Sequence, residues 1–127
     1  MISFDDFKAG GDGPLYLQII DYIKRGAVAG TILDGDELPS RRVVPALLGI
    51  NPNTVQKAFA ILEEEGLMES RTGARSCMTL SPQKLEDLRI QLLSKDIRGI
   101  TESLKAAGIG KDEALALISR YWDGTQE

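Results

Sequence analysis

The link between two helical segments in the middle of the chain constrains the fold more than any other feature of the sequence. The first segment ends near Gly49, and the second starts at Asn51-Pro52, because Asn is a good helix cap and Pro fits the first position of a helix. A link of so few residues forces the two helices to cross steeply, so that the second projects from the domain. The sequence therefore predicts a helix-turn-helix unit.

The neighbouring segments predict further helices around this unit. Residues 14–30 carry one apolar stripe at helical spacing and end at a Gly. Residues 31–37 contain an Asp-Gly-Asp turn, and Ser40 is a good cap for a short second helix. We expect the third helix to run to Gly66 and to turn its apolar residues inward.

After the third helix, the pattern changes to two short strands and then returns to helix. Residues 67–71 and 76–80 are predicted to pair as strands, and residues 72–75 join them as a hairpin loop. Ser81-Pro82 then starts a long helix, which breaks at residues 107–110, and a last helix follows to about Trp122.

This order predicts a mainly α (α+β) protein. A winged helix-turn-helix domain at residues 1–80 is followed by a two-helix dimerisation tail at residues 81–127. A projecting helix with small polar side chains at its start fits the major groove of double-stranded DNA.

The composition excludes several classes of protein. The chain has no histidine and one cysteine, which excludes an internal disulfide framework, a zinc finger and a nucleophile activated by histidine. Paired carboxylates and a phosphate-binding loop are also missing, so the sequence predicts no enzyme and no cofactor. No apolar run suggests a membrane span, and no signal peptide is recognisable, so we expect a soluble, cytoplasmic protein.

The charge of the whole chain argues against binding to nucleic acid, whereas its distribution does not. The net charge is −4 and the sequence pI is about 4.9. Residues 1–37 hold three basic and seven acidic side chains, and residues 38–80 hold five basic and four acidic ones. Because distant charges are screened, DNA responds to the field of the middle segment more than to the net charge.

Four segments together resemble the DNA-binding domain of the GntR family of bacterial transcription regulators. They are PLYLQI at residues 14–19, GDELPSRR at 35–42, LGINPNTV at 48–55 and LEEEGL at 62–67. The short two-helix tail is similar to that of the YtrA subfamily. The resemblance implies a homodimer, held largely by the tail, that binds a two-fold operator and usually represses transcription.

The resemblance also implies roles for single residues. Arg42 matches an arginine that contacts DNA in the family. Asn51, Asn53 and Thr54 match the polar start of the recognition helix, and Gly73 matches the glycine at the tip of the wing, which approaches the minor groove.

Three positions depart from the family pattern. Pro45 stands where alanine is usual inside the second helix, and it is expected to kink or shorten that helix. Arg75 replaces a wing glycine, where it either adds a phosphate contact or changes the hairpin turn. Cys77 and Met78 replace an aromatic residue and valine.

The residue types alone support a set of DNA contacts. Arg41 and Arg42 lie at a helix start, where the helix dipole disfavours cations. Binding to a DNA phosphate would explain why two arginines occur at this position. Asn53 and Gln56 can pair with adenine, and Lys57 can reach guanine or a phosphate. The alternative is an ordinary solvated polar face.

Other conspicuous residues have plainer interpretations. Cys77 lies in an alternating strand and is expected to be a buried small hydrophobic residue. Residues 63–65 are expected to form a solvated helix end that faces away from DNA. Asp34, Asp36 and Glu37 resemble half of a calcium loop without its distal acid, so we interpret them as a turn and predict no metal site.

The tail carries apolar stripes that either pack on the winged domain or meet a partner chain. We predict a dimerisation surface formed by Leu88, Leu92, Ile97, Ile100, Leu104, Ile118, Tyr121 and Trp122. Two helices leave little room for a closed small-molecule pocket, and the sequence assigns no effector.

The leading hypothesis is a homodimeric, sequence-specific transcription regulator, with a recognition helix at about residues 51–66 and a wing at about residues 71–76. The alternative is a winged-helix module for protein–protein contact, which the acidic net charge favours.

Overall fold

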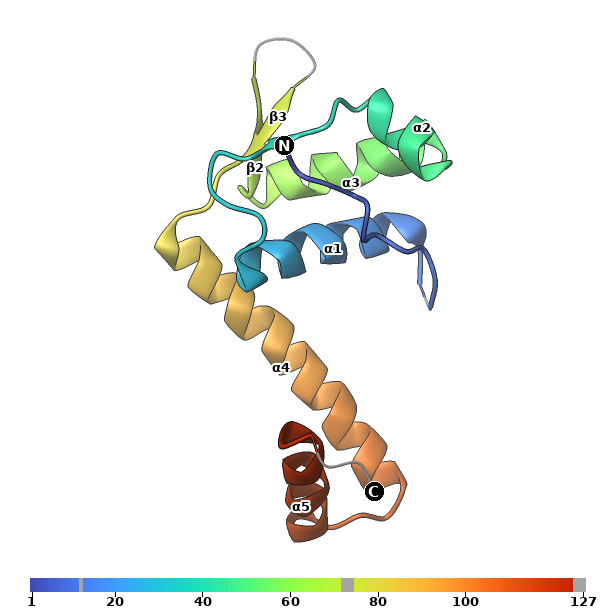
Figure 1. Cartoon of the computed structure of the whole chain (residues 1–127), viewed down its shortest axis with the longest axis vertical. Coiled ribbons are helices and arrows are strands. Elements are labelled where there is room, and N and C mark those ends of the chain that lie inside the picture. The colour runs from blue at the N-terminus through green and yellow to red at the C-terminus, as the bar shows by residue number, and fades with distance from the viewer. Residues whose placement is uncertain (12, 72–74, 125–127) are drawn as a thin grey trace. The chain divides into compact units, whose positions relative to one another are not determined.

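The computed structural model describes residues 1–11, 13–71 and 75–124. Its elements follow one another as α1 (Leu15–Ala29), β1 (Glu37–Leu38), α2 (Val43–Leu48), α3 (Pro52–Glu64), β2 (Met68–Ser70), β3 (Ser76–Met78), α4 (Pro82–Ala106) and α5 (Lys111–Trp122) (Figure 1). The chain divides into two compact units, Met1–Arg89 and Ile90–Glu127, and the division falls inside α4.

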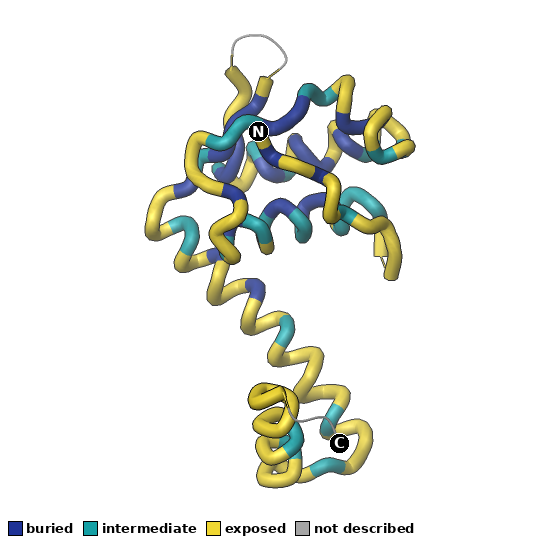
Figure 2. Tube along the Cα trace, viewed as in Figure 1, coloured by how far each residue is buried: buried dark blue, intermediate teal, exposed yellow. Residues whose placement is uncertain are grey.

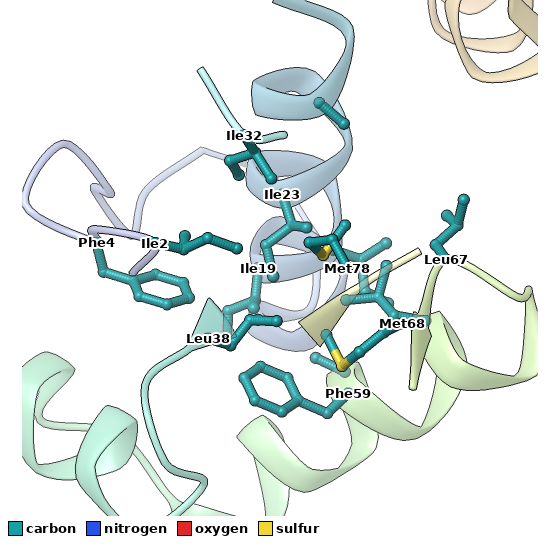
Figure 3. Packing of buried hydrophobic residues seen from close by; sticks show 14 of the residues in the cluster. Ile2, Phe4, Ile19, Ile23, Ile32, Leu38, Phe59, Leu67, Met68 and Met78 are labelled. Atoms are coloured by element: carbon teal, nitrogen blue, oxygen red, sulfur yellow. The ribbon is translucent and has the colours of Figure 1, made fainter. Parts of the chain in front are cut away.

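The first unit is built around α1 and α3, which lie side by side (Figure 1). The predicted stripe of α1 is confirmed, because Ile19, Ile20, Ile23 and Ala27 are its buried residues. Side chains from both helices, the sheet and the first residues of the chain meet in one apolar core (Figure 3). Figure 2 shows buried positions along each of these segments. Burial of this continuous apolar surface holds the helix-turn-helix in place.

The turn between α2 and α3 agrees closely with the prediction. Gly49 ends α2 in the left-handed region, with φ +65°, which a residue with a side chain rarely adopts. The Oδ1 of Asn51 accepts a hydrogen bond of 2.8 Å from the N–H of Asn53, so the predicted cap of α3 is confirmed.

The start of α2 differs from the prediction. The helix begins at Val43, later than a Ser40 cap implied. Ser40 still makes the bonds of a cap, because its Oγ accepts from the N–H of Arg42 at 3.1 Å and its carbonyl accepts from the N–H of Val44 at 3.0 Å. Pro45 is buried in the first turn of this six-residue helix. A proline there breaks no helical hydrogen bond, because N–H groups of the first turn have no partner within the helix.

The sheet has three antiparallel strands in the order β1-β3-β2. The two predicted strands are confirmed in shorter form as β2 and β3, and Cys77 in β3 is buried as expected. Strand β1 was missed, because residues 31–37 were interpreted as a turn. Its Glu37 pairs with Cys77, and the Glu37 carbonyl accepts a 2.7 Å hydrogen bond from the N–H of Ile2.

The first residues of the chain belong to the core, which the sequence analysis did not predict. Ile2 and Phe4 are buried, and the Phe4 ring stacks on the Tyr22 ring at 5.5 Å between centroids. The Tyr22 hydroxyl donates a 2.8 Å hydrogen bond to the Ser3 carbonyl. Burial raises the pKa of Tyr22, and the nearby carboxylates of residues 5 and 6 raise it further.

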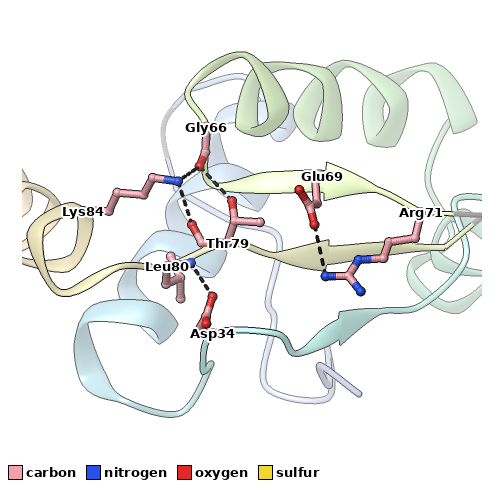
Figure 4. A network of polar contacts seen from close by, with 7 residues as sticks. All are labelled: Asp34, Gly66, Glu69, Arg71, Thr79, Leu80 and Lys84. Atoms are coloured by element: carbon pink, nitrogen blue, oxygen red, sulfur yellow. Dashed lines mark hydrogen bonds and ion pairs between the residues drawn. The ribbon is translucent and has the colours of Figure 1, made fainter.

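A small polar network ties the end of α3 to the start of α4 (Figure 4). The Gly66 carbonyl accepts hydrogen bonds from Lys84 Nζ at 2.6 Å and from Thr79 Oγ1 at 2.9 Å. Nearby, Asp34 Oδ1 accepts a 2.8 Å bond from the N–H of Leu80. This network, which we call the α4 anchor, fixes the first turn of α4 on the winged domain.

The second unit contains the remainder of α4 and helix α5. Asp112 and Glu113 lie in the first turn of α5 and Arg120 lies in its last turn, as the helix dipole favours. None of the side chains of α5 is buried. No helix within the described ranges is both long enough and apolar enough to cross a membrane.

Candidate nucleic-acid interface

The first turns of α3 present a polar, exposed face. Asn51, Asn53, Gln56 and Lys57 are exposed and Thr54 is half-buried, whereas the apolar side of the same helix lies in the core. The structure therefore brings all five predicted residues of this helix to one end of it. Their amide, hydroxyl and ammonium groups are of the kinds that read base edges and phosphates.

The Lys57 ammonium is held by an aromatic ring. Its Nζ lies 4.1 Å from the centroid of the half-buried Tyr16 ring in α1, within the range of a cation–π interaction. Tyr16 was not predicted to take part in the site, and no local pattern identifies it, because the two residues meet only through the packing of α1 on α3.

The two adjacent arginines before α2 have different environments. Arg41 forms an ion pair with Glu63 of α3, whereas Arg42 is exposed and its guanidinium has no ion-pair or hydrogen-bond partner among the residues that the structure describes. Glu63 was expected to be solvated, but its side chain is only 32% exposed.

The basic residues of the hairpin are paired with carboxylates. Arg75 Nη1 lies 3.3 Å from both carboxylate oxygens of Glu37 in β1, and Arg71 Nη2 lies 3.1 Å from Glu69 Oε1. Both pairs are exposed, so a competing phosphate can replace either carboxylate at small cost. The predicted wing residue Gly73 lies outside the described residues.

The predicted tail residues separate into two groups. Leu88 and Leu92 are buried, and Leu88 belongs to the core of the first unit. A second stripe on α4 is exposed, and α5 also exposes large apolar side chains. The exposed large residues of the two helices are Ile90, Leu93, Ile97, Ile100, Leu115, Ile118, Tyr121 and Trp122, and Leu104 is half-buried.

The predicted dimerisation surface combines residues of two different stripes of α4. Ile90, Leu93, Ile97, Ile100 and Leu104 follow one another at three- and four-residue steps, which places them on one helix face. This spacing was available in the sequence, and Ile90, Leu93 and Leu115 were missed as surface candidates. In the part of the chain that the structure describes, no group of three His, Cys, Asp or Glu residues can hold a metal ion.

Known proteins place this architecture in one family. Residues 15–76 match the profile of the bacterial regulatory proteins of the gntR family. The chain is 32% identical to the HTH-type transcriptional regulator YhcF of Bacillus subtilis (strain 168) over 111 residues, which cover 87% of this chain and 92% of YhcF. The chain belongs to the GntR family.

Two further likenesses refine this placement within the GntR family. The HTH-type transcriptional repressor YtrA of Bacillus subtilis (strain 168) is 35% identical over 92 residues, covering 72% of this chain and 66% of YtrA. A GntR family transcriptional regulator from Listeria monocytogenes superposes with a TM-score of 0.79 at 28% identity, covering 88% of this chain and 98% of that one. The chain is thus a YtrA-like, DNA-binding transcription regulator with a winged helix-turn-helix fold.

Proposed function

We propose that this GntR regulator represses transcription as a homodimer bound to a two-fold operator. The start of α3 enters the major groove, and the hairpin at about residues 71–76 approaches the adjacent minor groove. The observation that carries the proposal is the exposed polar face of α3, together with the guanidinium of Arg42 before α2, which has no partner among the described residues. Asn53, Gln56 and Lys57 read the bases, and Arg42 binds phosphate.

The homodimer is supported by the exposed apolar stripe of α4. A row of Ile and Leu side chains from Ile90 to Leu104 is too large and regular to be left in water, and a symmetric partner covers it with its own equivalent stripe. Leu88 and Leu92 are already buried within the protomer. The interface that we propose therefore includes Ile90 and Leu93 in place of these two residues.

A winged-helix module for protein–protein contact is the second candidate function. The net charge of −4 and the pairing of Arg41, Arg71 and Arg75 with carboxylates favour it. The two candidates differ in one measurable property, because DNA binding releases counterions and is therefore steeply weakened by salt.

The test is fluorescence anisotropy of the purified full chain on the duplex upstream of its own gene, with a scrambled duplex as control, from low to physiological salt. Tight, salt-sensitive binding with a preference for the natural duplex supports an autoregulating repressor. Equal binding to both duplexes contradicts this operator, and no binding at low salt favours the protein-contact module. As a DNA-bound regulator, the protein acts in the cytoplasm and has no enzymatic role.

A further inference from the structure

Arg41 lies beside Arg42 in the chain, yet its guanidinium points into the domain. Its Nη2 is paired with Oε1 of Glu63, near the end of α3, and lies 3.4 Å from Ser70 Oγ in β2. The Ser70 hydroxyl donates a 2.8 Å hydrogen bond to the same Glu63 oxygen. One carboxylate therefore collects a cation and a hydroxyl from two other segments, which are 22 and 7 positions away from it.

Packing adds to this arrangement. The Arg41 Cζ lies 5.6 Å from the centroid of the Phe59 ring, which is fully buried in the core. The side chain of Arg41 is only 23% exposed. A partly buried, charge-assisted pair of this kind is stronger than the exposed pairs of the hairpin, because water screens it less.

The short turn that carries both arginines is thus held at two points. Ser40 accepts the N–H groups of residues 42, 43 and 44 through its hydroxyl and its carbonyl, and Arg41 ties the turn to α3 and β2. Arg42 lies on this fixed backbone with an exposed side chain. A binding group on a fixed base loses less entropy when it binds than one on a mobile base.

We propose that Arg41 is a positioning residue that acts through Glu63 and Ser70, and that it is not a DNA contact. The three side chains hold the turn before α2 against the recognition helix, so that Arg42 and the start of α3 meet the same DNA segment. The inference rests on the proposed DNA interface and replaces the direct phosphate contact expected for Arg41.

Glu63→Gln separates the two roles of Arg41 by the sign of its effect. If Arg41 is a positioning residue, removing the charge of its partner weakens DNA binding, by roughly threefold to tenfold. If Arg41 binds phosphate, the same change frees it from a competitor and tightens binding, which would overturn the proposal. Anisotropy of the full-length protein on its best duplex measures the effect.

Glu64→Gln is the matched control. Glu64 is exposed on the same helix, it has no ion pair among the described residues, and the substitution changes the net charge equally. Glu64→Gln is expected to leave binding unchanged or slightly tighter. Equal shifts for Glu63→Gln and Glu64→Gln would mean that only net charge matters, and would overturn the positioning role.

The salt dependence of Arg41→Gln gives a second, independent readout. A positioning residue lowers the affinity and leaves the slope of log K against log salt unchanged, whereas loss of a phosphate contact reduces the slope by about 0.9. Arg41→Gln combined with Glu63→Gln is expected to be no weaker than either variant alone. Wild-type protein without salt-sensitive binding would refute the DNA interface itself. This outcome differs from failure of the positioning role, which appears only in the variants. Thermal melting confirms that each variant is folded.

Discussion

Arg42 differs from the other arginines of residues 38–80 in having no acidic partner among the described residues. Its backbone N–H is bound to Ser40, while its side chain is exposed. When such a guanidinium binds phosphate, it gives up only water. Its contact therefore contributes more to the binding free energy than that of an arginine that must first leave a carboxylate.

Arg42→Gln is therefore expected to weaken operator binding roughly tenfold and to reduce the salt slope by about 0.9. The melting temperature is expected to stay the same, because the exposed Arg42 side chain has no ion-pair or hydrogen-bond partner among the described residues. Anisotropy over a salt series and a thermal melt check these outcomes, with the exposed Lys8→Gln as the control. Wild-type affinity in Arg42→Gln would refute the contact.

Glu37 is expected to oppose DNA binding, because it occupies the guanidinium of Arg75. Glu37→Gln frees Arg75 for a phosphate and removes a negative charge near the hairpin. Binding is expected to become about twofold to fivefold tighter at low salt, with a smaller gain at high salt. If the affinity falls in the same titration, Arg75 does not bind phosphate.

At the scale of elements, the sequence predicted the order of helices and strands and the cap of α3, because each has a local signal in periodicity, proline or asparagine. Strand β1 has only two residues, too few to show alternation, and it exists because β3 and the backbone of Ile2 supply its partners. The pairing of Arg41 with Glu63 was equally invisible, since only the tertiary fold brings those segments together.

The α4 anchor links the recognition helix to the tail helix through the Gly66 carbonyl. Lys84→Met keeps most of the unbranched apolar side chain and removes the ammonium that donates to Gly66 and Thr79. The free energy of unfolding is expected to fall by about 1–2 kcal/mol, as measured by chemical denaturation. Lys95→Met, at an exposed site on the same helix, should change it far less. Equal losses in both variants would contradict the role of the anchor.

For the whole molecule, the decisive surface is the exposed stripe of α4. Ile97 is 62% exposed and lies in the middle of the stripe. Ile97→Glu is expected to convert the proposed dimer to a monomer in sedimentation velocity, and to weaken operator binding roughly tenfold or more, because two linked half-site contacts become independent.

Gln91→Glu introduces the same charge on another face of α4 and should leave the dimer intact. A dimer that survives Ile97→Glu would show that another surface joins the protomers. Sequence periodicity alone found the apolar residues of this helix. It did not separate residues that face the protomer's own core, such as Leu88, from residues that stay exposed, such as Ile97. The residues of the two stripes alternate along the same stretch of sequence.

The carboxylates that pair with Arg71 and Arg75 affect how strongly the regulator binds the many non-specific sites of a chromosome. Non-specific DNA holds a protein almost entirely by charge, and here much of that charge is already neutralised within the protomer. Because both pairs are exposed, this effect is modest, and we expect it to shorten visits to bulk DNA slightly.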